Sequence, residues 1–127
     1  MSKPAELGSL KVGHNIVIDG EPCRIVELEK SKPGKHGAAK ARIDAIGIFD
    51  NQKRSIVQPV TAKIYVPIVE RKTAQVISVS GDTVQLMDLS DYSTFELSIP
   101  EELKGNIEVG KEIQYLEYEG RRKIATR

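Results

Sequence analysis

The sequence of 127 residues has one cysteine, no tryptophan and two histidines. A single thiol, Cys23, excludes an intrachain disulfide and any zinc site built from several cysteines. His14 and His36 lie far apart in the sequence, so they do not form the closely spaced ligand pair of a metal site. We therefore expect no metal and no disulfide framework.

An excess of one charge and a long apolar run are also missing. Nineteen Lys and Arg oppose eighteen Asp and Glu, so the net charge is +1. This balance excludes a polycation that binds nucleic acid by bulk charge. No apolar run approaches the roughly 20 residues of a membrane helix, and residues 1–20 lack the apolar core of a signal peptide. Together with the single cysteine, these features predict a cytoplasmic protein without a membrane partner.

The apolar residues that are present are mostly β-branched. Fourteen Ile and eleven Val stand against eight Leu and eight Ala, which favours strands over helices. Gly, Pro, Asp and Asn separate about ten short strand-like runs, and one helical turn is expected at 100–104. The predicted strands are 15–19, 23–30, 39–49, 54–58, 63–68, 74–79, 83–88, 94–99, 112–118 and 121–126. Short loops between many strands indicate an all-β chain of small barrels.

The charge distribution divides the chain into two domains. Residues 1–70 carry 11 basic and 8 acidic side chains, whereas residues 71–127 carry 8 basic and 10 acidic ones. A proline and a charge cluster lie in 66–72, so we place the boundary there. The predicted domains are 1–70 and 71–127.

One segment, 30–42, has basic residues but no acid. Its five basic residues are Lys30, Lys32, Lys35, Lys40 and Arg42, and it also contains His36. Its centre, P-G-K-H-G, has turn chemistry between two strand-like runs, which predicts a long hairpin with Lys35 at its tip. Gly34 and Gly37 remove side-chain bulk beside Lys35 and let the backbone approach a phosphate closely.

Several interpretations of this segment compete. A solvated basic hairpin with no function is one. A phosphate-binding P-loop fails on spacing and lacks the hydroxyl that binds magnesium. The G-x-x-G of a KH domain is matched by letter, but that loop joins helices and these flanks resemble strands. A lysine nucleophile needs a substrate pocket, which an exposed tip does not offer, so an enzyme is not expected.

The residues themselves carry a family resemblance. Residues 31–40, S-K-P-G-K-H-G-A-A-K, resemble the modification loop of translation initiation factor 5A. The likeness extends to I-D-G-E-P-C at 18–23, G-I-F at 47–49, and the segments 84–89 and 92–96. The short N-terminus and Pro33 are similar to archaeal members. Bacterial elongation factor P is also similar, but it has a third domain for which this chain is too short.

The resemblance implies an SH3-like barrel followed by an OB-fold barrel. It also implies that Lys35 is the lysine that deoxyhypusine synthase modifies, with spermidine as aminobutyl donor and NAD in the synthase. Whether the product is deoxyhypusine or hypusine stays open. No bound cofactor is implied for the chain itself.

The function implied by the resemblance is binding to the ribosome beside peptidyl-tRNA. There the modified Lys35 would promote peptide-bond formation and relieve stalls such as those at consecutive prolines. Partners would be the ribosome, peptidyl-tRNA, ribosomal RNA and deoxyhypusine synthase, with no DNA. The expected contact residues around Lys35 are Lys32, Gly34, His36, Gly37, Lys40 and Arg42. The alternative is an unmodified RNA-binding module of SH3 and OB type.

Two further expectations concern single residues. Cys23 lies in an apolar strand-like run and is predicted to be a buried structural thiol. Four aromatic residues of the second half could stack on bases, but that half has a net charge of −2, so we expect them to pack in the core instead. They are Tyr92, Phe95, Tyr115 and Tyr118.

Overall fold

The computed structural model describes residues 2–31 and 39–126. The chain divides into two compact units, Met1–Ile68 and Val69–Arg127. The boundary thus falls before the charge cluster at 70–72, because Glu70 already begins a strand of the second unit. Nearly all regular structure is β-strand, which confirms the all-β prediction. Within the two described ranges, no helix is long and apolar enough to cross a membrane.

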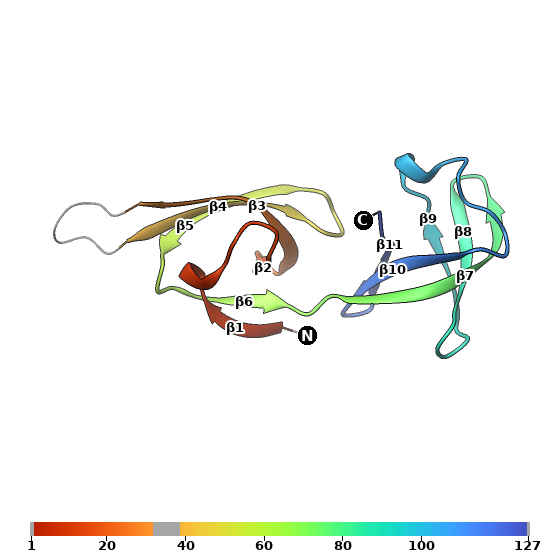
Figure 1. Cartoon of the computed structure of the whole chain (residues 1–127), viewed down its shortest axis with the longest axis horizontal. Helices are drawn as coiled ribbons and strands as arrows, with labels where there is room; N and C mark the ends of the chain where they lie inside the picture. The colour runs from red at the N-terminus through yellow and green to blue at the C-terminus, as the bar shows by residue number, and fades with distance from the viewer. Residues whose placement is uncertain (1, 32–38, 127) are drawn as a thin grey trace. The chain divides into compact units, whose positions relative to one another are not determined.

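The N-terminal unit consists of two antiparallel sheets (Figure 1). Strands β2 to β5 follow one another in a four-stranded meander, whereas β1 pairs with β6 in a two-stranded sheet beside β2. The strands are β1 (Ser2–Glu6), β2 (Asn15–Ile18), β3 (Glu21–Ser31), β4 (Lys40–Gly47), β5 (Lys53–Pro59) and β6 (Lys63–Pro67). A 3₁₀ turn, η1 (Leu7–Ser9), follows β1. The meander and the strand pair enclose the core of a small barrel.

Alternation along the strands produces this core. In β4, Ala41, Ile43 and Ala45 point inward and are fully buried, while Lys40 before them and Arg42 between them are exposed. This period of two is what places one face of a strand on a core. Cys23 is also fully buried, which confirms the prediction for this thiol. The other buried apolar residues of the unit are Leu7, Leu10, Ile16, Ile18, Ile25 and Ile64.

Strand β1 was not predicted from the sequence. Its residues, S-K-P-A-E, are mostly polar and show no clear alternation. They are extended because their backbone pairs antiparallel with β6, from Ser2 opposite Pro67 to Glu6 opposite Lys63. Pro4 is tolerated because this two-stranded sheet has no further strand to pair with. The strand is thus a product of tertiary pairing, which local patterns do not report.

The hairpin of β3 and β4 is the longest in this unit, and the two strands run together to one end of it (Figure 1). Pairing extends from Cys23 opposite Gly47 to Ser31 opposite Lys40. The register shifts at Val26, where one extra residue on β3 forms a β-bulge. The hairpin therefore carries residues 30–31 and 40–42 to the end of the sheet.

The C-terminal unit is a single five-stranded sheet with the order β11-β10-β7-β8-β9. Its two outer strands, β11 and β9, contact each other and close the sheet into a barrel. The elements are β7 (Glu70–Ser80), β8 (Thr83–Asp88), β9 (Thr94–Ser98), η2 (Glu101–Leu103), β10 (Glu112–Tyr118) and β11 (Arg121–Ile124). The helical turn predicted at 100–104 is confirmed as η2. The buried core residues include Ala74, Val76, Val84, Leu86, Ile99, Tyr115 and Ile124.

Two of the predicted hairpin turns use left-handed backbone. Asp19 and Gly20 have φ values of 53° and 78°, and Glu119 and Gly120 have 47° and 82°. Two consecutive residues with positive φ are typical of the type I′ turn, whose twist matches that of the paired strands. These turns connect β2 to β3 and β10 to β11.

Candidate nucleic-acid interface

The acid-free basic segment coincides with the end of the β3–β4 hairpin. Lys30 and Ser31 end β3, and Lys40 and Arg42 lie at the start of β4. Five of the predicted site residues lie outside the described residues, namely Lys32, Gly34, Lys35, His36 and Gly37. The structure therefore describes the flanking residues, 30–31 of β3 and 40–42 of β4, which we call the stem.

The basic side chains of the stem lie on its two faces. Lys40 and Arg42 alternate with buried Ala41 and Ile43, so they share the outer, exposed face of β4. Lys30 pairs with Ala41 across the hairpin, and directly paired residues share a face. Lys30 is therefore on the opposite side of the sheet from Lys40 and Arg42.

On its face, Lys30 reaches a neighbouring element. Its Nζ donates a hydrogen bond to the carbonyl oxygen of Gly8 in η1 at 2.9 Å. Gly8 is itself joined to the turn after β5, because its backbone N–H donates to the carbonyl of Val60 at 2.8 Å. A side chain at position 8 would place its Cβ 3.1 Å from both the Cβ and the carbonyl oxygen of Val60. The close approach of η1 to this turn is thus well suited to glycine.

The other strand of the hairpin is joined to the same turn. The N–H of Val60 donates to the carbonyl of Ala39 at 2.9 Å, immediately before β4 begins. Leu7 adds a further link, because its N–H donates to the carbonyl of Ala62 at 2.9 Å and its side chain is fully buried. The base of the hairpin end is therefore hydrogen-bonded on both sides to the body of the barrel.

Arg42 is exposed but lies near a buried carboxylate. Its Nε is 3.9 Å from Oδ1 of Asp44, and its side chain is 61% exposed. Asp44 accepts a hydrogen bond from the hydroxyl of Ser55 at 2.5 Å. This bond, together with the charge of Arg42, keeps the pKa of Asp44 below its ordinary value despite burial. Asp44 is therefore an anion that draws the guanidinium of Arg42 toward the sheet.

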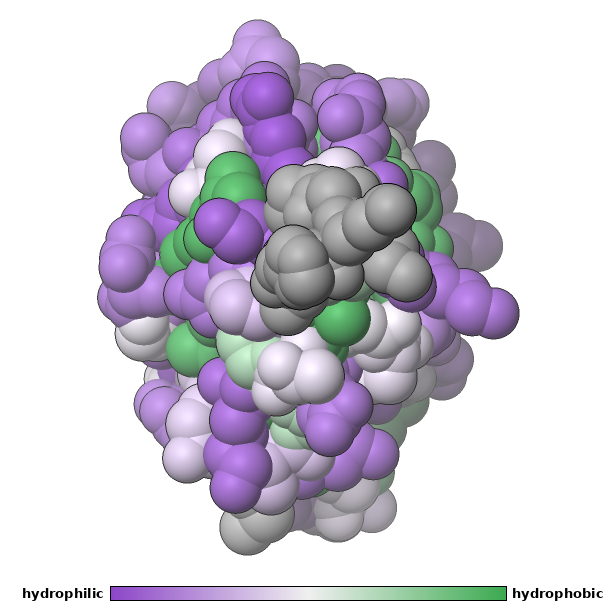
Figure 2. Space-filling view, turned by 90° about the vertical axis from the view of Figure 1, so that its left-hand side faces the viewer, coloured by the Kyte–Doolittle hydropathy of each residue, from purple (hydrophilic) through white to green (hydrophobic). Residues whose placement is uncertain are grey.

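Along the stem, the positively charged stretch ends where acidic residues begin. Glu29 pairs with Arg42 and Glu27 pairs with Asp44 across the hairpin, on the outer face. Seen from the end of the hairpin, the surface of the molecule is largely hydrophilic, with hydrophobic areas between the polar residues (Figure 2). Positive charge is thus concentrated at the end of the hairpin. Such an arrangement suits a local contact with a phosphate backbone rather than an extended groove.

In the C-terminal unit, the aromatic residues differ in their surroundings. Tyr115 and Tyr118 are buried, as predicted. Phe95 packs on Tyr115 with ring centroids 4.8 Å apart, and the guanidinium of Arg122 lies 4.6 Å from the centre of its ring. Tyr92 contradicts the prediction of core packing, since it is 70% exposed. It lies in the turn between β8 and β9 with a φ of 61°, outside the strands whose alternation places side chains on the core.

Asp88 organises that turn from inside the barrel. Its carboxylate accepts hydrogen bonds from the hydroxyls of Ser90 and Tyr115, and from the backbone N–H of Ser90 at 2.7 Å. Because these donors favour the charged form, the pKa of Asp88 lies well below its ordinary value although the residue is only 2% exposed. Burial and the same hydrogen bond raise the pKa of Tyr115 to about 12.

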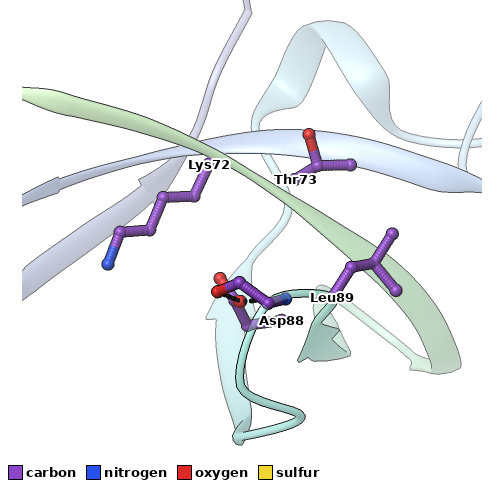
Figure 3. A pocket seen from close by; sticks show the side chains of 5 residues that line it. Lys72, Thr73, Asp88 and Leu89 are labelled. Atoms are coloured by element: carbon purple, nitrogen blue, oxygen red, sulfur yellow. Dashed lines mark hydrogen bonds between the residues drawn. The ribbon is translucent and has the colours of Figure 1, made fainter.

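An open hollow of about 390 Å³ lies beside Asp88 (Figure 3). Its lining residues are Lys72, Thr73, Asp88, Leu89 and Ser90. The amine of Lys72 donates to Glu117 at 2.8 Å, and this bond raises the pKa of Lys72 to about 12. The two charged residues of the lining, Lys72 and Asp88, are thus bonded to partners within the protein.

Sequence reasoning missed Lys72, Asp88 and their partners. The run D-L-S-D-Y-S has turn chemistry, so the turn could be predicted, but the bond from Tyr115 joins residues 27 positions apart. Among residues 2–31 and 39–126, no group of three or more His, Cys, Asp or Glu is placed to hold a metal ion.

Comparison with known proteins is consistent with this two-unit architecture. Residues 1–62 match the family described as "Translation initiation factor 5A-like, N-terminal". Residues 68–126 match "Eukaryotic elongation factor 5A hypusine, DNA-binding OB fold". The second match confirms the predicted OB fold of the C-terminal unit.

Whole-chain relatives agree. The chain is 64% identical to translation initiation factor 5A of Methanoregula boonei, over 98% of this chain and 99% of that protein. It is 67% identical to that of Archaeoglobus fulgidus, over 98% and 97%. The solved structure of the factor 5A from Methanococcus jannaschii matches with a TM-score of 0.89 and 50% identity, over 98% of this chain and 92% of that one.

Two barrels in tandem, with basic charge gathered at the end of one hairpin, define a translation factor of the two-barrel class. The predicted resemblance is confirmed: the chain belongs to the translation initiation factor 5A family, and the three relatives named above are archaeal.

Proposed function

We propose that this protein acts in the cytoplasm, bound to the ribosome beside peptidyl-tRNA, and promotes peptide-bond formation where synthesis stalls. Consecutive prolines are such a case, because the ring fixes φ and the nucleophilic nitrogen is a secondary amine. Family membership supports the role in translation. The observation that carries the proposal to a site is the hairpin end, where basic residues stand on a stem hydrogen-bonded to the barrel on both sides.

In this proposal Lys35 is the functional residue. Deoxyhypusine synthase would transfer an aminobutyl group from spermidine to its amine, which forms the new C–N bond of deoxyhypusine and releases 1,3-diaminopropane. Hypusine would be the product only if a hydroxylation follows. The longer side chain carries two cationic nitrogens on a thin stem, which can follow a phosphate backbone where the barrel does not fit. Holding the acceptor end of peptidyl-tRNA in a reactive geometry accelerates the reaction by positioning.

The surrounding residues supply binding rather than chemistry. Lys32, His36, Lys40 and Arg42 would contact RNA phosphates, and Gly34 and Gly37 would let the backbone approach them closely. Lys40 and Arg42 are exposed on one face of β4, consistent with this role. No step of the proposed action requires the protein to act as an enzyme.

The first test is the intact mass of the protein purified from its native host. We expect an increase corresponding to one aminobutyl group, with or without one oxygen, and peptide mapping that assigns it to Lys35. Protein made in a bacterium without the synthase should have the unmodified mass. An unmodified native protein that binds isolated RNA strongly would favour the free-standing RNA-binding module instead.

The second test measures peptide-bond formation on reconstituted ribosomes stalled at consecutive prolines. Lys35→Ala should abolish rescue while leaving the fold intact. Lys63→Ala is the matched control, because Lys63 is an exposed lysine on β6 of the same unit. Full rescue by the Lys35→Ala variant would contradict the proposal.

A further inference from the structure

The two strands that lead to the hairpin end are both tied to one pair of elements. β3 is tied through Lys30 to Gly8 of η1, at 2.9 Å. β4 is tied through the carbonyl of Ala39 to the N–H of Val60, also at 2.9 Å. Gly8 and Val60 are joined in turn by a backbone hydrogen bond of 2.8 Å. These four residues form a continuous series of contacts at the base of the hairpin end, which we call the brace, and the pairing of β3 with β4 joins its two ends.

The brace differs from the rest of the hairpin in how it is held. Below it, β4 is paired on both sides, with β3 and β5, down to Ile46. At the end of the hairpin this ladder stops, since Ser31 opposite Lys40 is the last pair on one side and Lys40 opposite Pro59 the last on the other. The brace therefore begins where sheet pairing ends. It is the last set of described contacts that can fix the direction of the hairpin end.

Lys30 has a particular place among the basic residues of 30–42. The register turns it away from the face that carries Lys40 and Arg42. Its amine is engaged with a carbonyl 22 residues earlier in the chain. A lysine that contacts phosphate has to release such a bond, whereas a lysine that holds the hairpin has to keep it.

We propose that Lys30 is a positioning residue for the modified hairpin end, acting through Gly8, and makes no phosphate contact of its own. This inference rests on the proposed function, because it assumes that the hairpin end contacts RNA on the ribosome. Its basis is the geometry of the brace: removing the amine breaks the bond between the end of β3 and η1, close to the point where the ladder stops. The binding surface of the variant then has to be ordered at the moment of binding, which weakens affinity without removing an ionic contact.

The salt dependence of ribosome binding separates positioning from phosphate contact. Each phosphate contact that is lost lowers the slope of log affinity against log salt concentration by roughly 0.7 to 0.9. The experiment compares the modified wild-type protein with Lys30→Met, Lys30→Arg and Lys40→Met on ribosomes carrying peptidyl-tRNA. Lys40→Met is the matched control, because it removes the same group from the outer face of the same hairpin. The modification state of every variant is checked by mass.

For Lys30→Met we expect affinity about fivefold weaker at every salt concentration, as the loss of one net hydrogen bond gives, with an unchanged slope. Lys30→Arg should restore affinity, because its guanidinium can donate to the same carbonyl. Lys40→Met should instead reduce the slope. Gly8→Ala, which brings its new Cβ against Val60, should resemble Lys30→Met in its unchanged slope while leaving all charges in place.

Three results would overturn the inference: a reduced slope for Lys30→Met, unchanged affinity for it, or no restoration by Lys30→Arg. Failure of the proposed function has a different signature. In that case the wild type itself would not bind these ribosomes, or Lys35→Ala would bind and rescue as well as the wild type.

Discussion

The phenolic hydroxyl of Tyr115 on β10 donates a hydrogen bond to the carboxylate of Asp88 at the end of β8. Both residues are almost completely buried. The bond joins a core aromatic ring to the residue that orders the β8–β9 turn, because the carboxylate of Asp88 also accepts hydrogen bonds from the backbone N–H and the hydroxyl of Ser90. The stability of the OB-fold unit and the shape of that turn are therefore coupled through one carboxylate.

Removal of the phenolic hydroxyl should destabilise the OB-fold unit. Tyr115→Phe keeps the ring packing but leaves a buried carboxylate with one donor fewer, for which we expect a loss of about 2 kcal/mol. Amide hydrogen exchange of Val76 and Leu86 in its core measures the effect. Tyr92→Phe serves as the control, because Tyr92 is exposed in the same unit. Equal effects of the two substitutions would contradict this account.

The low pKa of Asp88 predicts how the stability of this unit depends on pH. A carboxylate whose pKa is lower in the folded than in the unfolded protein stabilises the fold above the unfolded pKa, near pH 4. That contribution is lost as the pH falls toward the folded-state value. Asp88→Asn should therefore be less stable than the wild type at pH 7, with the difference shrinking below pH 4. Denaturant unfolding across this range measures it, with exposed Asp82→Asn as the control.

The space beside Gly47 gives a prediction for the N-terminal barrel. The carboxylate of Asp50 lies where a Cβ at position 47 would be, and it accepts two bonds from Arg54 at 3.1 and 2.8 Å. Gly47→Ala should displace this carboxylate and cost about 2 kcal/mol of unfolding free energy. In an Asp50→Ala background the same substitution should cost much less, which a double-mutant cycle tests. Additive effects would show that the overlap is relieved in another way.

The hydrogen bond from Ser55 should be the main cause of the lowered pKa of Asp44. Ser55→Ala is expected to raise that pKa toward its ordinary value, and Arg42→Met to raise it less, because Arg42 is more exposed and more distant. Carboxyl-carbon NMR titration reports both values. A larger effect of Arg42→Met would mean that the ion pair, and not the hydroxyl, holds Asp44 charged.

Much of the architecture could be predicted because it follows from local chemistry. The turn at Asp19 and Gly20 and the alternation of Ala41 and Ile43 identify their strands from a few neighbouring residues. Strand β1 could not be predicted, because Pro4 and its polar neighbours become extended only against β6. The same reason explains the exposed Tyr92, whose backbone is set by a turn that depends on buried Asp88.

The candidate site, too, has features that local sequence predicts and features that depend on distant contacts. Sequence reasoning placed the basic segment at the end of a hairpin and included Lys40 and Arg42, which are exposed there. It counted Lys30 only as one of the basic residues of that segment, because its partner Gly8 lies in a distant turn. Nor could it foresee that Asp44 approaches Arg42, since an aspartate within a strand run gives no sign of burial. Predictions for Lys35 itself rest on the family and on the proposed experiments.

The β-bulge at Val26 lets Ile25 and Leu28, which are three positions apart, face the same side of β3. Before it, Ile25 points into the core; after it, Leu28 does, and Lys30 shares the side of Leu28. Deletion of Val26 would bring the pair of Ile25 and Ala45 directly before the pair of Glu27 and Asp44, so the bulge would disappear while Leu28 and Lys30 kept their side of the sheet. Insertion of one residue after Glu27 would instead reverse the parity of the rest of β3 and turn Lys30 away from Gly8, so an insertion here should harm the protein more than deletion of Val26.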